Sequence, residues 1–179
     1  MRMPKLLLAM IVTLSPLAAR VAAAAPLAPA ETTPAQAEAA RQALVDWFEC
    51  EECEEKQLEA VKEHGQLVVP LLRSALLKGA APATREIYRR GLSARYDELE
   101  KYAERHAYAK PASTREEFVA NGLKNLDAQY QVRASRALAV IGGLAARQAL
   151  EAGAASSPRA DVRDSIKAAL GRGALSINY

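Results

Sequence analysis

The sequence is poor in aromatic residues and has no stretch in which apolar and polar residues alternate as they do in a half-buried strand. Aromatic residues make up 5% of the 179 residues, with two Phe and one Trp. Val, Ile and Thr are sparse, so little in the chain favours β-structure. The abundant residues are Ala, Leu, Glu, Gln, Lys and Arg, which are the best helix formers. The composition therefore predicts an all-α protein.

The chain also lacks the short motifs that carry most enzymatic chemistry. It contains no Gly-x-Ser-x-Gly, no His-Glu-x-x-His, no Walker loop and no Gly-x-Gly-x-x-Gly that follows a strand. The only histidines, His64 and His106, fall on separate predicted helices and form no acid–base set. We therefore expect a non-enzymatic protein with no catalytic residue, no metal site and no cofactor.

Cysteine is nearly absent too, since Cys50 and Cys53 are the only two. Their Cys-x-x-Cys spacing is that of thiol oxidoreductases, which activate the first Cys at a helix N-terminus. This pair instead follows a predicted helix and lies in the Glu-rich segment 49–55, where negative neighbours raise the pKa of a thiol. A closed zinc site needs four ligands. We expect a disulfide, formed after export, that pins the turn between the first two helices; the alternative is a thiol-redox or metal-handling pair.

Acidic residues are missing from the first 24 positions, which have the features of a secretory signal. Arg2 and Lys5 precede the apolar run 6–14, and the small residues of Val21–Ala25 provide a cleavage site, for which we expect cutting after Ala24. The apolar run is shorter than the roughly 20 residues of a membrane span. The prediction is a signal peptide at 1–24 and an exported protein, in the periplasm or outside the cell, with no stable membrane anchor.

Removal of that segment changes the charge balance. The full chain has 24 Lys plus Arg and 21 Asp plus Glu, a net charge of +3. Arg2, Lys5 and Arg20 lie in the signal, which leaves 21 residues of each sign and a net charge of zero. The whole-chain excess of basic residues is therefore no evidence for nucleic-acid binding. We expect no nucleic-acid partner.

Composition and turn residues divide the mature chain into three parts. Residues 25–34 are rich in Pro, Ala and Thr and predict a flexible leader. A single helical domain is expected over 35–173, with its first helix beginning near Pro34, and a short tail over 174–179.

Two of the predicted helices have apolar stripes at helical spacing. Gln66–Lys78 is expected to be a helix with Pro70 in its first turn, and the longest helix is expected over Thr84–Tyr108 with Thr84 as its N-cap. The first stripe consists of Leu67, Leu71, Leu72, Ala75 and Leu76. The second consists of Tyr88, Leu92, Leu99, Tyr102 and His106.

Turn residues place the later helices. Ser113 or Thr114 is expected to cap a helix, because each has a Glu three residues on, as in a capping box. That helix has a stripe of its own, and Gly142-Gly143 is expected to end the helix after it. A short return helix over 144–151 is expected to end at Gly153, and a last helix to begin at Ser157-Pro158 and stop at 171–173. The stripe consists of Val119, Leu123, Leu126 and Tyr130.

One short pattern occurs twice near the C-terminus. Gln131-Val132-Arg133-Ala134-Ser135 is followed thirty positions later by Asp161-Val162-Arg163-Asp164-Ser165, and each copy leads into an Ala-rich apolar run. A recurring unit of this size predicts stacked helical hairpins, each burying its apolar face on its neighbours.

These residues resemble HEAT repeats, the paired-helix units of solenoid scaffolds. The stretches 132–142 and 161–170 resemble the first helix of a repeat, and Gly65–Leu72 with its Val-Pro sequence resembles the second. The likeness covers about half of the mature chain and departs from the family at the long helix over 84–108. It implies an irregular, right-handed stack of antiparallel hairpins. HEAT-type families include protein-binding scaffolds, adaptors and a few chromophore-attaching lyases.

The resemblance favours a protein-interaction module or scaffold whose partner is another protein. The candidate interaction surface consists of Tyr88, Arg89, Arg133, Arg136 and Arg163. For Arg133 and Arg163 the resemblance implies a second role, in hydrogen bonds to turn residues such as Asp161. The alternative function is a periplasmic thiol-redox or metal-handling protein that uses Cys50 and Cys53.

Overall fold

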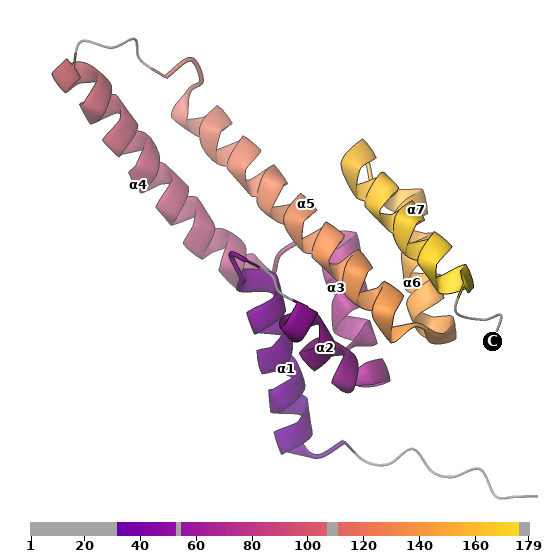
Figure 1. Ribbon diagram of the computed structural model, residues 1–179. Helices are drawn as coiled ribbons and strands as arrows, with labels where there is room; N and C mark the ends of the chain where they lie inside the picture. The colour runs from indigo at the N-terminus through magenta and orange to yellow at the C-terminus, as the bar shows by residue number, and fades with distance from the viewer. Residues whose placement is uncertain (1–31, 53–54, 107–110, 176–179) are drawn as a thin grey trace, which may run out of the picture. The chain divides into compact units, whose positions relative to one another are not determined.

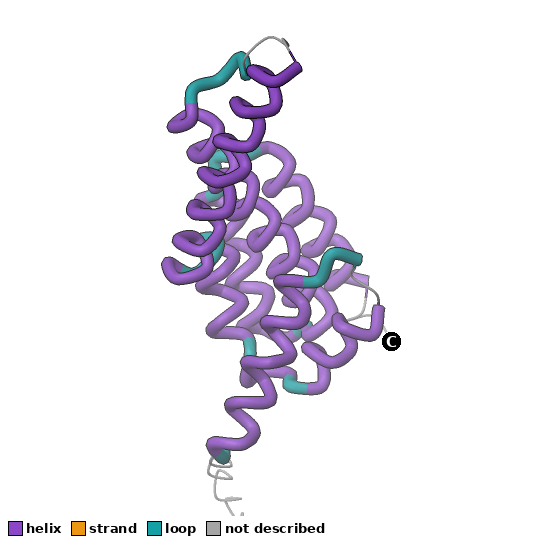
Figure 2. Tube along the Cα trace, turned by 90° about the vertical axis from the view of Figure 1, so that its left-hand side faces the viewer, coloured by secondary structure: helices purple, strands orange, loops and turns teal. Residues whose placement is uncertain are grey.

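The computed structural model describes residues 32–52, 55–106 and 111–175, and within them every regular element is helical (Figures 1 and 2). The predicted all-α class is confirmed for this part of the chain. The predicted signal peptide, most of the leader and the last four residues lie outside it. The elements are α1 (Pro34–Glu49), α2 (Glu55–Glu63), a 3₁₀ turn (Gly65–Leu67), α3 (Val69–Lys78), α4 (Pro82–His106), α5 (Arg115–Ile141), α6 (Gly143–Ser156) and α7 (Ala160–Leu175).

Capping residues explain where two of the helices begin. The Thr33 side chain accepts from the backbone N–H of Gln36, whose side chain accepts from Thr33 in return, and α1 starts at Pro34 as predicted. Thr114 and Glu117 form the same reciprocal pair at the start of α5, which confirms one of the two predicted caps. Such a cap is worth about 1 kcal/mol.

Helix α5 is the central element, and it packs against α1, α2, α3, α4, α6 and α7 (Figure 1). Its 27 residues carry both the stripe that ends at Tyr130 and the first copy of the repeated pattern. The predicted break at Gly142-Gly143 is confirmed, because both glycines have positive φ angles, 67° and 81°.

The core has two parts, divided along α5. The larger part joins α1, α2, α3, α6 and α7 to the second half of α5, and its fully buried members include Leu72, Leu138 and Ile166. The smaller part lies where the start of α4 meets the first half of α5, and consists of Ala80, Leu123, Leu126 and Tyr130. Beyond that smaller core the remainder of α4 packs mainly on α5, so the two form a hairpin.

The predicted stripe of α3 is wrong at two positions. Leu67 and Leu71 are exposed, Leu71 by 47%, and Val68 and Val69 are buried instead. The chain passes through the 3₁₀ turn before α3 begins, and this tighter turn changes which residues face the core. Leu72 and Leu76 are buried, as predicted.

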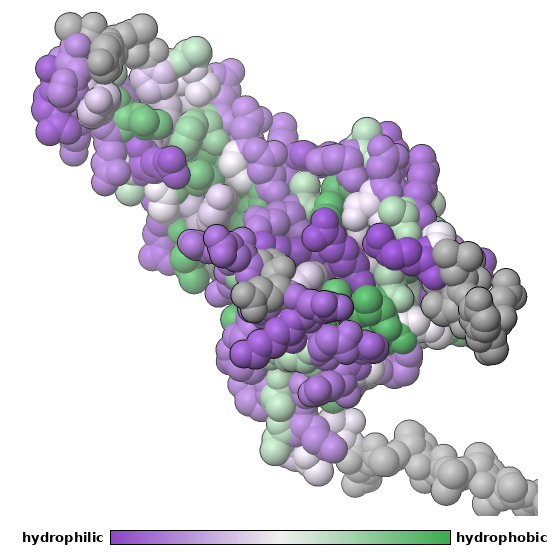
Figure 3. All heavy atoms as spheres, in the orientation of Figure 1, coloured by the Kyte–Doolittle hydropathy of each residue, from purple (hydrophilic) through white to green (hydrophobic). Residues whose placement is uncertain are grey.

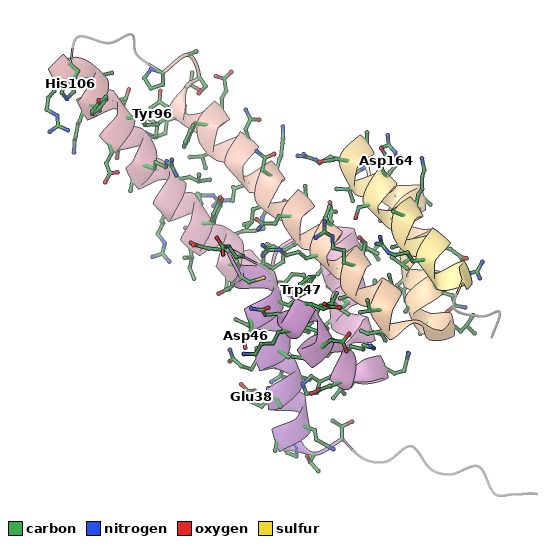
Figure 4. All side chains as sticks on the ribbon, viewed as in Figure 1. Glu38, Asp46, Trp47, Tyr96, His106 and Asp164 are labelled. Atoms are coloured by element: carbon green, nitrogen blue, oxygen red, sulfur yellow. The ribbon has the colours of Figure 1, made fainter. Side chains whose placement is uncertain are left out.

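The predicted stripe of α4 is also largely wrong, and so is its N-cap. Tyr88, Leu99, Tyr102 and His106 are exposed, whereas Tyr96 and Ala103 are buried. Tyr96 points towards α5, where its ring packs on Phe118 (Figure 4). The buried side of α4 is therefore rotated away from the predicted stripe, which becomes one flank of the hairpin. The helix starts at Pro82 rather than after Thr84.

Glycines did not end the last two helices where predicted. Helix α6 continues past Gly153 to Ser156, and α7 runs from Ala160 through Gly171 to Leu175. A glycine inside a helix costs only about 1 kcal/mol relative to alanine. At Gly153 the small residue is required, because an added Cβ would lie 2.7 Å from a methyl carbon of Leu76.

Candidate functional site: the α1–α4–α5 groove

A groove opens where the C-terminal end of α1 meets the first turns of α4 and the middle of α5. We call it the α1–α4–α5 groove, and its volume is about 400 Å³. It unites residues that the sequence analysis singled out for different reasons, namely Cys50, Tyr88 and Arg133. Its other lining residues are Phe48, Glu49, Glu51, Thr84, Ile87, Leu126, Gln129 and Tyr130.

An aromatic stack forms the floor of the groove. The rings of Phe48 on α1 and Tyr130 on α5 lie parallel, with their centroids 4.6 Å apart. Burial raises the pKa of the Tyr130 hydroxyl, the nearby Glu49 raises it further, and a hydrogen bond with Thr84 and the charge of Arg133 oppose the rise. Tyr130 therefore stays neutral. Composition alone did not identify this stack, because the two rings are far apart in the sequence.

Arg133 fastens the end of α1 to α5. Its guanidinium donates to the carbonyl oxygens of Phe48 and Cys50, the latter at 2.6 Å. When the side-chain amide of Gln129 is oriented with its oxygen towards Arg133, that oxygen also accepts from the guanidinium, at 2.8 Å. In return the indole N–H of the buried Trp47 donates to the Arg133 carbonyl at 3.1 Å (Figure 4). Cationic donors are suited to the last carbonyls of a helix, which carry partial negative charge.

Burial lowers the pKa of Arg133, and the neighbouring charge of Arg136 lowers it further, while Tyr130 acts in the opposite direction. An arginine nevertheless remains protonated in proteins. Its positive charge is directed towards backbone carbonyls, so Arg133 is occupied inside the fold.

Arg163, the counterpart of Arg133 in the second copy of the repeated pattern, also binds backbone. Its guanidinium donates to the carbonyls of Ser157 and Pro158, at 3.0 and 2.8 Å. Asp161 pairs instead with Arg159, at 2.8 Å, so the expected hydrogen bonds from Arg133 and Arg163 to Asp161 are absent from the structure. Both arginines therefore bind the chain near a helix end, Arg133 at the end of α1 and Arg163 just before α7. In both cases the acceptors are backbone carbonyls and not a carboxylate.

The five residues of the predicted interaction surface do not form one patch. Tyr88 and Arg133 line the groove, and Arg133 and Arg136 line a neighbouring polar hollow between α5 and the start of α7. Arg89 pairs with Glu86 at 2.8 Å, and Arg163 lies on α7; neither lines the groove.

Exposed apolar side chains form the outer wall of the groove. Ile87 is 66% exposed and Tyr88 is 43% exposed, although both sit on a well-formed helix next to the smaller core. Figure 3 shows further hydrophobic residues along the α4–α5 hairpin. The sequence analysis placed Tyr88 both in an apolar stripe and in the candidate interaction surface, and it did not single out Ile87.

Cys50 lies at the edge of the groove, with its Sγ atom 3.0 Å from the Trp47 carbonyl oxygen. Cys53 lies outside the described residues, so the Cys50–Cys53 disulfide stays a prediction. Across the described ranges no group of three or more His, Cys, Asp and Glu side chains is placed to hold a metal ion.

A second, more apolar hollow of about 480 Å³ lies at the turn between α5 and α6. Leu144, at 73% exposure, is its most exposed member. Its one charged residue, Arg147, pairs with Glu151 at 3.0 Å. No fixed polar group orients a ligand there, in contrast to the α1–α4–α5 groove.

No known family model, curated protein or solved structure matches this chain. The likeness to HEAT repeats therefore depends on the residue pattern quoted above, and a function must be argued from the groove. Among the helices that the structure describes, none is long and apolar enough to cross a membrane.

Proposed function

We propose that this protein is a non-catalytic interaction module that binds a partner protein in the α1–α4–α5 groove. One observation carries the proposal: Ile87 and Tyr88 are exposed beside an apolar floor that the fold itself holds in place. Scattered exposed apolar residues need no explanation, but apolar side chains gathered around a concave surface mark binding sites.

The floor is pre-organised, which favours binding. The stack of Phe48 on Tyr130 joins α1 to α5, and Arg133 holds the last carbonyls of α1. Groups that are already ordered lose little conformational entropy when a partner binds, so more of the interaction energy contributes to affinity.

We also propose that the helices form a short HEAT-like stack. In support, α5 packs on α7 and α3 packs on α6, as the first and second helices of successive repeats would. The corresponding serines of the two pattern copies, Ser135 and Ser165, lie with their Oγ atoms 2.9 Å apart. A stack of this kind displays an extended surface that is suited to binding a partner. Together with the N-terminal pattern, this supports the proposal of an exported scaffold.

The proposal is tested by affinity capture from the cell envelope with three baits. These are the wild-type protein, Ile87→Ser and Leu144→Ser. Both substitutions remove an exposed aliphatic side chain, but only Ile87 lines the groove. We expect one set of proteins to be recovered on the wild type and on Leu144→Ser, and to fall by about tenfold on Ile87→Ser, because a buried aliphatic anchor contributes about 1.5 kcal/mol or more. Recovery that depends on Leu144, or on neither residue, contradicts the proposal.

A further inference from the structure

The rim of the groove carries negative charge that no described residue neutralises. Glu49 and Glu51 line the groove, and Glu52 follows them on the exposed surface. None of these carboxylates forms an ion pair with another residue in the described ranges. On α4, Arg85 pairs with Asp127 and Arg89 pairs with Glu86, so neither of these cations is free to pair with Glu49 or Glu51.

The one cation inside the groove does not change this balance. The Arg133 guanidinium is directed to the carbonyl oxygens of Phe48 and Cys50, which carry the partial negative charge of the α1 C-terminus. Arg133 therefore offsets the helix end, and the carboxylates of Glu49 and Glu51 remain available to a ligand. The raised pKa of Tyr130, to which Glu49 contributes, agrees with a negative field at this site.

We propose that the groove binds a protein segment in which an apolar or aromatic side chain is flanked by Lys or Arg. The apolar side chain enters between the Ile87–Tyr88 wall and the Phe48–Tyr130 floor, and the flanking cations lie against Glu49 and Glu51. This inference rests on the proposed function and specifies the chemistry of its partner.

The size of the groove sets how much of the partner enters it. Its volume of about 400 Å³ is near the lower end of the roughly 300–1,000 Å³ range of ligand pockets. It therefore accommodates anchor side chains and not a whole helix. The cations stay at the rim in contact with water, where charge contributes to orientation and to the rate of association more than to affinity.

The test uses two labelled peptides of equal length and equal apolar content, with Phe and Leu at the centre. One has Lys and Arg on both sides of the apolar residues, and the other has Glu at the same positions. Binding to the purified full chain is followed by fluorescence anisotropy. The variants are Glu49→Gln/Glu51→Gln and its matched control Glu98→Gln/Glu104→Gln, which removes the same charge from exposed positions on the outer part of α4.

We expect the basic peptide to bind and the acidic peptide not to bind. The Glu49→Gln/Glu51→Gln variant should weaken binding of the basic peptide about fivefold, as expected for the loss of two exposed ion pairs. The Glu98→Gln/Glu104→Gln variant should bind like the wild type, and added salt should remove most of the difference.

Three outcomes overturn the inference. If both peptides bind equally and Ile87→Ser weakens both, the partner chemistry is wrong while the groove remains the binding site of the proposed function. If neither peptide binds, or if the basic peptide binds Ile87→Ser as well as the wild type, the assignment of this chemistry to the groove is wrong.

Discussion

Replacement of Arg133 by methionine is expected to release the C-terminal end of α1 from α5. The guanidinium of Arg133 donates to the carbonyls of Phe48 and Cys50. Methionine keeps much of the aliphatic contact of arginine and removes its charged donors. The variant therefore isolates the hydrogen bonds from the packing.

The magnitude follows from the two carbonyls that lose a charged donor. A hydrogen bond to a charged group contributes about 1.5–3 kcal/mol when both partners are shielded from water. Arg133 is only partly buried, so water can replace some of this. We expect the free energy of unfolding to fall by about 2–3 kcal/mol. Arg136→Met is the control, because Arg136 is a neighbouring exposed arginine with no hydrogen bond or ion pair to a described residue. This control should change the free energy of unfolding by less than about 0.5 kcal/mol.

Urea unfolding followed by two signals provides the assay. Far-ultraviolet circular dichroism reports all helices, and fluorescence reports Trp47, the only tryptophan, which is 3% exposed and donates to the Arg133 carbonyl. In Arg133→Met the fluorescence transition should come at lower urea than the dichroism transition, because α1 leaves first. Equal stability of Arg133→Met and Arg136→Met, with coincident transitions in both, would refute the structural role of Arg133.

Three further predictions concern single residues and the two cysteines. Gly79→Ala should destabilise the protein by about 2–4 kcal/mol, because Gly79 has a φ of 79° and an added Cβ would lie 2.6 Å from the Cβ of Asp127. Gly91 lies in open space on α4, so Gly91→Ala should stabilise the protein by about 0.5–1 kcal/mol. Thermal melts of both variants check this. The carboxyl pKa of Asp161, held at about 2 mainly by its hydrogen bond with Arg159, should rise towards its ordinary value in Arg159→Ala, and an NMR titration of the carboxyl carbon measures the shift. Since the pKa is lowered in the folded state, this group stabilises the fold at pH values above its ordinary pKa. That stabilisation is lost as the pH falls towards 2. A thiol count should find no reactive thiol before reduction and two after it; reactive thiols without reductant would favour the redox or metal-handling alternative.

The fold class and several helix starts could be predicted from the sequence because they depend on local chemistry. Pro34, the Thr114–Glu117 pair and the Gly142-Gly143 break each act within a few residues, and each is found where it was predicted. The repeated pattern was also informative, since its two serines, Ser135 and Ser165, lie in contact.

Tertiary packing decided the features that were predicted wrongly. The stripe on α4 was chosen by spacing alone, but the side of α4 that packs on α5 carries Leu92, Tyr96 and Ala103, of which only Leu92 belongs to that stripe. Gly153 does not end α6; it is a small residue within the helix, where Leu76 occupies the space that a side chain would need. No local signal reports the position of a neighbouring helix.

The groove could not be predicted as a unit for the same reason. Phe48, Ile87 and Tyr130 come from three helices, and only the fold brings them together. The sequence did mark Cys50 and Tyr88 separately, as a possible redox residue and as part of the candidate interaction surface. The acidic segment after α1 was considered for its effect on the cysteines, and its position at the rim of an apolar groove became visible only in three dimensions.

Hydroxyl-radical footprinting of the protein alone and bound to its captured partner tests the central claim most directly. Oxidation of Ile87 and Tyr88, which are exposed in the groove wall, should fall when the partner binds, while Leu144 at the other hollow should react as before. Protection of Leu144 with unchanged reactivity of Ile87 and Tyr88 would contradict the assignment of the α1–α4–α5 groove as the binding site.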